Sequence, residues 1–463
     1  MILDRRRLLS AALAGGAGAA VGMSGRLLAQ GDEHIAAAQW ALIFGPEKAF
    51  AEALDLLSAH GRPDVAPAMI LALRYTRAPA APIVAALEDV TGARAGPDWF
   101  DWMLWQEAHP EVTPHPSYPL FKRELMLQID PAFDNFLKPE YMARDRMHIR
   151  LEEITWGGVR KDGIPSLDNP NLVTAEAASY LKDDDLIFGV AINGDVRAYP
   201  LRIMGWHEMF NEVIGGVPVA LAYCTLCGSG ILFETQLPGR PAPFVFGSSG
   251  FLYRSNKLMF DRETHSLWNQ FTGKPVMGPL WNSGIELRQR PVVITRWDAW
   301  RKDNPDTRVL SLQTGHRRDY GSGVVYNDYF ASDDLMFPTA VDQRLHKQKD
   351  YVFGLRVQGG AKAWPLEAFI DRRVINDEVA GLPVVLIGDA KTRTVRAYAR
   401  GDAQQFSAAA GGALKDANGQ TWRVGEESLT GPGGLSHARM AGHIAYWFAW
   451  NGYLGGFAEL YEG

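Results

Sequence analysis

The chain has 463 residues, a formal net charge of -6 and only two cysteines. This length is typical of two or three domains, and two cysteines are too few for a scaffold stapled by disulfides. The acidic balance, with no basic run beyond the first thirty or so residues, argues against partners such as nucleic acid or an anionic membrane surface.

The first 29 residues have the pattern of an export signal. Arg5-Arg6-Arg7-Leu8-Leu9 precedes a Gly/Ala-rich apolar run, and Leu27-Leu28-Ala29 offers a cleavage site. The arginines followed by a Leu pair favour the twin-arginine route, with an ordinary secretory signal as the alternative because Asp4 replaces the usual Ser or Thr. Removal of four arginines and one aspartate would take the formal charge from -6 to -9. We therefore expect a periplasmic or otherwise extracytoplasmic protein.

Residues 30–149 are predicted to form a helical domain and a Pro-rich linker. Ala, Leu and Glu dominate residues 34 to about 110, and Gly or Pro punctuates helix-length segments there. The spacing resembles stacked hairpins of the HEAT kind, and an irregular helical bundle is the alternative. Such a domain would suit a protein partner. The Pro-rich connection from Pro110 to Pro139 indicates that a domain boundary follows.

From about residue 150 the composition changes to short alternating runs rich in Gly, Pro, Val and aromatic residues, which is typical of β-structure. The predicted fold class is therefore α+β, with a first β-rich lobe over residues 150–335. A second lobe and a C-terminal aromatic element are expected over residues 336–463. Glycines interrupt the apolar stretch from Ile444 to Leu460, so we expect it to be buried and expect no integral membrane segment after signal removal.

An internal repeat connects the two lobes. The segment Asp185–Leu201 aligns with Asp350–Leu366 at an offset of 165 residues, and the offset continues through Asn211 and Asn376 without a gap. The sequence therefore predicts a duplicated, two-lobed unit.

The two cysteines lie together as Cys224-Thr225-Leu226-Cys227, followed by Gly228. Two thiols at this spacing can cycle between dithiol and disulfide, supply two thiolates to a metal, or lock a turn as a disulfide. The motif is the strongest chemical signal of the chain, and the three uses remain open at this point.

A hairpin is predicted around the motif, with strands over residues 207–214 and 217–224 joined by a tight Gly-Gly loop. Directly opposed residues then have numbers that sum to 431, which would place His207 opposite Cys224, with Cβ atoms roughly 5 Å apart. An imidazole beside a thiol lowers the thiol pKa or supplies a second kind of metal ligand. In the second copy the same positions are Arg372 and Asp389, and Cys227 becomes Thr392, so only the first lobe is expected to be active.

Two further residues, Asp261 and His265, form a polar cluster in the segment that continues to Trp268. They are weaker candidates for the site. Glu208 neighbours His207, but strand alternation sends it to the other face, so no direct role is expected for it.

These residues resemble the domain-of-unknown-function family 3179 over about residues 150 to 460. The resemblance is carried by Trp206-His207-Glu208 with Asn211, Tyr223–Ser229, Phe246–Gly250 and Phe260–Gln270. This chain departs from the family pattern at Thr225, Ser229 and Phe260, none of which is an expected ligand or nucleophile. Some members are described as selenoproteins, and the resemblance implies that selenocysteine would lie in the Cys-x-x-Cys motif, which favours redox turnover.

The preferred hypothesis is an exported thiol oxidoreductase acting through Cys224, Cys227 and His207 on an unidentified redox partner or small molecule. Cys224 would be the reactive thiol and Cys227 the resolving one. No thioredoxin-like βαβ pattern surrounds the motif. The alternative is a copper or zinc protein that uses the same three residues with His265 or Asp261, because ligation by two sulfurs and two nitrogens suits either metal. A third hypothesis is a non-catalytic binding module with a structural disulfide.

Overall fold

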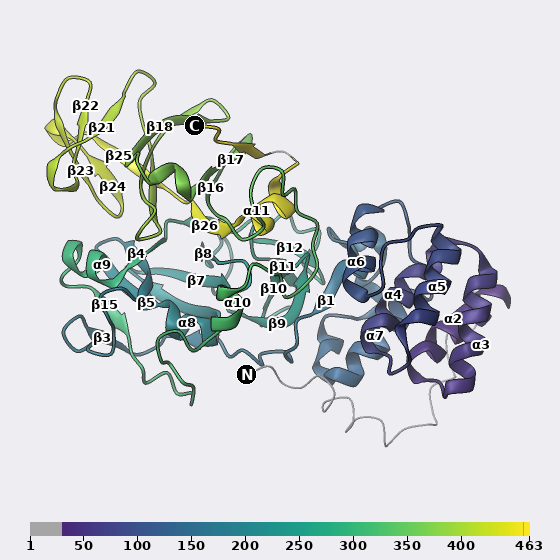
Figure 1. Ribbon diagram of the computed structural model, residues 1–463. Helices are drawn as coiled ribbons and strands as arrows, with labels where there is room; N and C mark the ends of the chain where they lie inside the picture. Colours follow the sequence, from purple (N-terminus) through teal and green to yellow (C-terminus); the bar gives the residue numbers. More distant parts are fainter. Residues whose placement is uncertain (1–29, 457) are drawn as a thin grey trace.

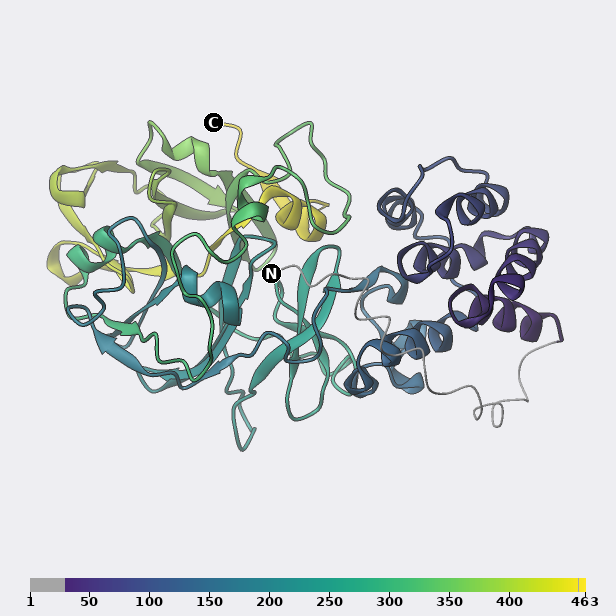
Figure 2. The ribbon, with the colours of Figure 1, turned by 60° about the horizontal axis from the view of Figure 1, so that its bottom comes forward.

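The computed structural model describes residues 30–456 and 458–463, so the predicted export signal lies outside the described residues. Figures 1 and 2 show a helical domain beside a larger β-rich part, in which strands from the two halves of the sequence lie next to each other. This is the expected α+β arrangement of N-terminal helices followed by β-structure. Among the described residues, no helix has the length and apolar character needed to cross a membrane.

Glycine and proline set several of the helix ends in the helical domain. Gly61 and Gly92 adopt left-handed φ values of 65° and 69° after two of the helices, as glycine C-caps commonly do. Pro46 and Pro79 directly precede helix starts. The segment expected to be only a Pro-rich connection contains a further helix, α7. The helices are α2 (Gln30–Phe44), α3 (Glu47–His60), α4 (Ala66–Tyr75), α5 (Ala80–Thr91), α6 (Trp99–Ala108) and α7 (Tyr118–Ile129).

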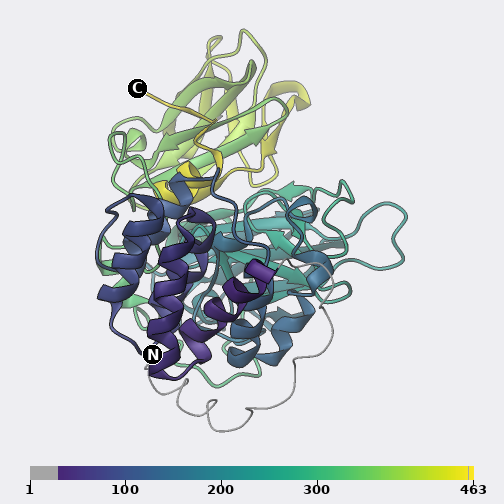
Figure 3. The same cartoon turned by 90° about the vertical axis from the view of Figure 1, so that its right-hand side faces the viewer.

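Helix α7 and the short 3₁₀ turns after it attach the helical domain to the β-rich part (Figure 3). Phe121, Phe133 and Phe136 share a core with strand residues Phe251 and Leu258. The buried Lys122 ammonium donates to the carbonyls of Leu151 and Ile154, at 2.5 Å each. The 3₁₀ turns are η1 (Pro63–Val65), η2 (Pro131–Asn135), η3 (Pro139–Tyr141), η4 (Arg144–Arg146) and η5 (Leu151–Glu153).

The first lobe contains three five-stranded sheets. The first, adjoining the helical domain, has β1 (Ile154–Trp156), β9 (Phe246–Tyr253), β10 (Asn256–Asp261), β11 (Leu267–Asn269) and β12 (Lys274–Met277). The second has β13 (Gln289–Arg290), β8 (Ser229–Glu234), β7 (Val217–Cys224), β6 (Met209–Ile214) and β2 (Leu167–Asp168). The third has β14 (Val293–Arg296), β4 (Leu186–Ile192), β5 (Asp195–Pro200), β15 (Arg308–Leu310) and β3 (Leu172–Thr174). The helices of this lobe are α8 (Leu201–His207), α9 (Trp297–Asp303) and α10 (Asn327–Ala331).

The second lobe has two sheets and a buried helix near its end. The smaller sheet has β26 (His443–Tyr446), β16 (Tyr351–Val357), β17 (Gly360–Pro365) and β27 (Ala458–Leu460). The larger has β18 (Val374–Val379), β19 (Leu382–Asp389), β20 (Thr394–Ala399), β25 (Ser436–Met440), β24 (Ser428–Thr430), β23 (Thr421–Val424), β22 (Leu414–Asp416) and β21 (Phe406–Ala408). Helix α11 (Trp447–Leu454) follows β26, and the 3₁₀ turns are η6 (Leu366–Phe369), η7 (Ala410–Gly412) and η8 (Pro432–Gly434). The first part of the predicted buried stretch, from Ile444 to Trp450, is buried, whereas Gly455, Gly456 and Glu459 near its end are exposed.

The two lobes have strands of matching length at a constant spacing. Each strand from β4 to β8 begins and ends 165 residues before its counterpart among β16 to β20. The packing matches as well. A Cβ added to Gly189 would lie 2.3 Å from Trp300, and one added to Gly354 would lie 1.9 Å from Trp450. In each lobe, therefore, a strand glycine makes room for a tryptophan from the helix that follows a neighbouring strand.

One hydrophobic core joins the lobes. Phe188, Tyr223 and Leu232 of the first lobe share it with Phe353 and Leu386 of the second. Because both faces of the central strands are covered, β7 carries apolar residues on both faces instead of alternating.

Both hairpins have the predicted register. In the first, Met209 pairs with Ala222 and Ile214 with Val217, around Gly215 and Gly216. In the second, Val374 pairs with Ile387 and Val379 with Leu382. Arg372, at the position equivalent to His207, precedes the strand, because β18 begins only at Val374, and its exposed guanidinium donates to the Tyr461 hydroxyl at 3.2 Å.

Candidate functional site

The last three residues of the Cys-x-x-Cys motif and Gly228 form the four-residue turn between β7 and β8. Cys224 is the last residue of β7 and pairs with Ser229, the first of β8. Inside the turn, Cys227 N donates to Cys224 O at 3.1 Å and Gly228 N donates to Thr225 O at 3.3 Å. Gly228 has a φ of +60°, and a Cβ there would press on the rings of Tyr351 and Tyr446 at 3.2 and 3.3 Å. The glycine after the motif is therefore required both by the turn and by the residues that cover it.

Both cysteines are buried free thiols, and they lie within one turn of the chain. Cys227 is 0% exposed, and its thiol donates to the Ser255 carbonyl at 3.5 Å. Burial raises the pKa of Cys227 well above its usual value, and the neighbouring Cys224 thiol raises it further. Cys227 is consequently held as the protonated thiol at neutral pH.

His207 does not take part in the cysteine hairpin as a strand residue. It ends helix α8, and strand β6 starts two residues later, so the predicted strand from residue 207 is wrong there. Its Nδ1 is 2.8 Å from Pro165 O, and its Nε2 is 2.6 Å from the Tyr320 hydroxyl. Burial lowers the pKa of His207 to about 4, and the charges of His316 and Arg318 act in the same direction. The ring is therefore neutral at pH 7, and its hydrogen-bond partners are oxygen atoms instead of sulfur.

The charged group beside the motif is instead an ion pair between Glu208 and Lys257. Glu208 Oε2 is 3.0 Å from Lys257 Nζ, and both side chains are nearly completely buried. Glu208 Oε1 accepts a hydrogen bond from the hydroxyl of Thr225, which lies between the two cysteines, at 2.9 Å. Sequence reasoning missed this pair because Glu208 was assigned to a strand face, whereas it terminates α8 with a left-handed φ of 54°.

Backbone contacts tie Glu208 to the cysteine strand. Tyr223 N donates to Glu208 O at 2.8 Å, which continues the hairpin ladder by one step. On the other side of β7, the Gln270 amide donates to Ala222 O at 2.8 Å and to Ser229 O at 3.2 Å. The sequence signal for Glu208 was its place in the Trp-His-Glu block. The signal for Gln270 was its place in the Trp-Asn-Gln block.

Aromatic residues from later in the chain close over the motif. The Tyr329 hydroxyl donates to Leu226 O at 2.7 Å, and Tyr446 N donates to Cys227 O at 2.8 Å. The Lys349 ammonium lies 3.8 Å from the centre of the Tyr329 ring. Helix α10 and strand β26 thus cover the turn, which explains why two thiols at the end of a hairpin are inaccessible to water.

A cavity of about 260 Å³ lies close to this cover. Its lining includes Lys349, Tyr351, Leu366 and Ile370. Tyr351 lines the cavity, and its ring also lies next to Gly228 of the cysteine turn.

Asp261 and His265 have structural partners of their own. Asp261 accepts hydrogen bonds from Thr264 N at 2.6 Å, from the Thr264 hydroxyl at 2.7 Å and from Trp268 Nε1 at 2.9 Å. The His265 ring packs against Phe136 and Phe260. The Asp261 carboxylate thus stabilises the turn between β10 and β11, and the His265 ring packs among aromatic side chains.

The five residues of the metal hypothesis are not gathered into one centre. Among the described residues, no group of three or more His, Cys, Asp or Glu side chains is arranged to hold a metal ion. The rings and carboxylates that would complete a copper or zinc site with the two thiols have the partners given above.

The candidate site therefore consists of two buried thiols at the end of a β-hairpin, next to the buried Glu208–Lys257 ion pair. The sequence matches the family described as "Protein of unknown function (DUF3179)" over residues 161–456. The match covers more than half of the chain, and the protein belongs to this family, as the resemblance indicated. No curated protein and no solved structure matches the chain.

Proposed function

We propose that the protein is an exported thiol oxidoreductase in which Cys224 and Cys227 cycle between a dithiol and a disulfide. The observation that supports the proposal most directly is that the only two cysteines are buried free thiols on one turn, which Cys227 N closes on Cys224 O at 3.1 Å. Twin-arginine or secretory export would deliver the pair to an oxidising compartment, where such chemistry is sustained.

The reaction is thiol–disulfide exchange with a disulfide of a protein or of a small molecule. A cysteine thiolate attacks the acceptor disulfide, one acceptor thiol leaves, and the second cysteine resolves the mixed disulfide. The Sγ–Sγ bond forms, and two electrons and two protons pass to the acceptor. Because the raised pKa of Cys227 disfavours its thiolate, we assign the first attack to Cys224 and resolution to Cys227.

Because the thiols are covered, we expect them to react with a partner only after the site opens. Burial keeps both thiols from large partners, and Tyr329 and Tyr446 bind the backbone of the motif directly. A partner would approach from the cavity beside Tyr351, or helix α10 would move. The buried Glu208–Lys257 pair does not take the activating role first expected of His207, because the Glu208 carboxylate raises the pKa of Cys227 further.

We further propose that the two lobes arose by duplication and that the second kept the geometry without the thiols. The constant offset of 165 residues between the strands of the two lobes and the matching glycine–tryptophan packing support this duplication. The HEAT-like character of the helical domain and its role in binding a protein partner remain predictions from the sequence.

A redox titration tests the function. Protein purified without chelators is equilibrated in glutathione buffers of increasing oxidation, quenched in acid, alkylated and weighed by mass spectrometry. The expected result is a single two-electron transition in which both cysteines lose reactivity together. Thiols that stay alkylatable in every buffer, or stoichiometric copper or zinc in the purified protein, would contradict the proposal.

A further inference from the structure

The turn between β9 and β10 has a strained backbone and lies directly beside the thiols. Tyr253 pairs with Asn256, and the two residues between them, Arg254 and Ser255, have φ values of +47° and +63°. Tight hairpin turns of this geometry prefer Asn and Gly, which adopt positive φ without strain. Left-handed non-glycine residues persist where surrounding contacts hold them, and this turn has such contacts on both sides.

One side of the turn meets the cysteine motif. The Ser255 carbonyl accepts the hydrogen bond from the Cys227 thiol at 3.5 Å, and Ser255 is only 3% exposed. The position of the carbonyl relative to the sulfur therefore depends on the conformation of the Arg254–Ser255 turn.

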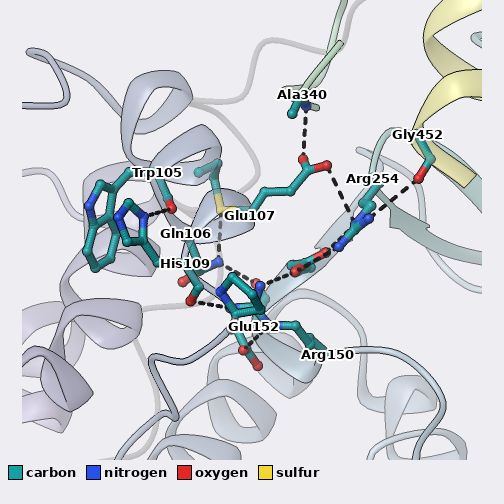
Figure 4. Close-up of polar contacts among 12 residues, drawn as sticks. Trp105, Gln106, Glu107, His109, Arg150, Glu152, Arg254, Ala340 and Gly452 are labelled. Carbon is teal, nitrogen blue, oxygen red and sulfur yellow. Dashed lines mark hydrogen bonds and ion pairs between the residues drawn. The ribbon is translucent and has the colours of Figure 1, made fainter. Parts of the chain in front are cut away.

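The other side of the turn is held by the Arg254 side chain, as Figure 4 shows. Its Nε lies 2.6 Å from Glu153 Oε2 and 3.6 Å from Glu107 Oε1, and its Nη1 donates to Gly452 O at 3.4 Å. Glu107 belongs to α6 of the helical domain and also accepts a hydrogen bond from Ala340 N at 3.0 Å. Glu153 is held in turn by Arg150 at 2.5 Å. One guanidinium thus joins the helical domain, the connection to β1 and helix α11.

We propose that Arg254 is a positioning residue for Cys227, and that through it the helical domain sets the redox equilibrium of the thiol pair. The inference rests on the proposed dithiol–disulfide function. Arg254 takes no part in electron transfer. It holds the turn that presents the Ser255 carbonyl to the thiol.

The sign of the effect follows from the chemistry of the bond. A thiol can donate to the carbonyl, but a disulfide sulfur has no proton to donate. The Ser255 contact therefore stabilises the dithiol relative to the disulfide. Loosening the turn should shift the equilibrium toward the disulfide, by about threefold, which corresponds to about 14 mV toward more negative potential at 29.6 mV per tenfold change.

The experiment compares three variants with a matched control. Arg254→Gln removes the charge, Arg254→Lys keeps the charge but loses the planar fork, and Glu107→Gln changes only the helical-domain contact while keeping an oxygen for Ala340 N. Arg262→Gln is the control, because Arg262 directly follows the opposite end of β10 and pairs with Asp168. Each protein is titrated in glutathione buffers as above, and its rate of alkylation is followed over a pH series.

The expected result is a shift toward the disulfide in the order Arg254→Gln, Arg254→Lys, Glu107→Gln, with Arg262→Gln equal to the parent chain. Cys227 should also ionise at lower pH in Arg254→Gln, because the bond that favours its protonated form is weakened. If Arg254→Gln does not fold, the redox titrations of Arg254→Lys and Glu107→Gln test the positioning role instead. A parent protein without a two-electron transition defeats the proposed function itself. A normal parent transition that none of the variants moves, or that Arg262→Gln moves equally, overturns the positioning role alone.

Discussion

The hairpins of the two lobes have the same backbone but different surroundings. Both have a four-residue turn after the second strand, closed by hydrogen bonds of 3.3 Å from Gly228 N to Thr225 O and from Arg393 N to Ala390 O. Asp389 takes the place of Cys224, and it is exposed where Cys224 is buried. The turn therefore does not need cysteines to form. What distinguishes the first lobe is the cover that removes its motif from water.

The residue before the first hairpin strand shows the same contrast. Glu208 and Arg373 each accept a backbone hydrogen bond from the opposite strand, at 2.8 and 2.9 Å. Glu208 is buried against Lys257, whereas Arg373 is exposed. Equal backbone positions thus carry a buried ion pair in one lobe and a solvated charge in the other, and this difference can be tested directly.

The largest difference is expected from the thiols themselves. Changing either Cys224 or Cys227 to Ser should abolish the reversible two-electron transition completely, because no second sulfur remains to form the bond. Changing Thr392 to Ser, at the position equivalent to Cys227, should leave the transition unaltered. Mass spectrometry of alkylated protein over a series of glutathione buffers measures both. A transition that persists in either cysteine variant would show that the oxidised species is not the internal disulfide.

The next largest effect is expected for the buried ion pair. Glu208→Gln leaves the Lys257 ammonium buried without a carboxylate, and breaking a buried pair in this way costs about 3–5 kcal/mol of unfolding free energy. The equivalent change in the second lobe, Arg373→Gln, concerns an exposed side chain and should stay within about 0.5 kcal/mol. Urea unfolding measures both free energies. Similar losses in the two variants would mean that the burial of Glu208 has no energetic consequence.

A smaller and symmetric effect is expected where the lobes pack alike. Gly189→Ala and Gly354→Ala each place a methyl group inside the van der Waals radius of a tryptophan ring, and overpacking of this kind costs about 1–3 kcal/mol. Gly452→Ala is a suitable control, because its added Cβ would meet only the Thr339 hydroxyl, at 3.7 Å. Thermal unfolding of the three variants compares them. Loss in one lobe only would contradict the equivalence of the two packing sites.

The smallest effect concerns acid stability. Burial lowers the pKa of His207 to about 4, below that of a histidine in the unfolded chain, so unfolding takes up a proton between these values. The stability contributed by neutral His207 is complete above about pH 6.5 and is lost as the pH falls toward 4. Between pH 7.5 and 6 the loss should be less than about 1 kcal/mol. It should disappear in His207→Gln and persist in Arg372→Gln, the change at the equivalent exposed residue. Urea unfolding over this pH range decides, and a His207→Gln curve parallel to that of the parent would refute the assignment.

Local sequence rules predicted the parts of the fold that local physics controls. Gly215 and Gly216 indicated the tight hairpin turn, and both adopt positive φ there, which sets the register of β6 and β7. The prediction failed at His207. Pro200 starts a seven-residue helix, and a helix this short carries too little periodicity to be distinguished from strand alternation. The side chain therefore points to Pro165 and Tyr320 instead of across the ladder.

The amino-acid sequence by itself determined the order of helical domain and β-rich lobes, the family, the hairpin register and the pair of cysteines, because these depend on residue patterns within a few positions or on a repeat at fixed spacing. Only the tertiary structure decided which groups meet the thiols. Glu208 and Lys257 are 49 residues apart in the sequence, and Ser255 and Cys227 are 28 residues apart. Tyr446, which also contacts Cys227, comes from near the end of the chain. Such contacts arise from the packing of whole sheets, and no local pattern encodes them.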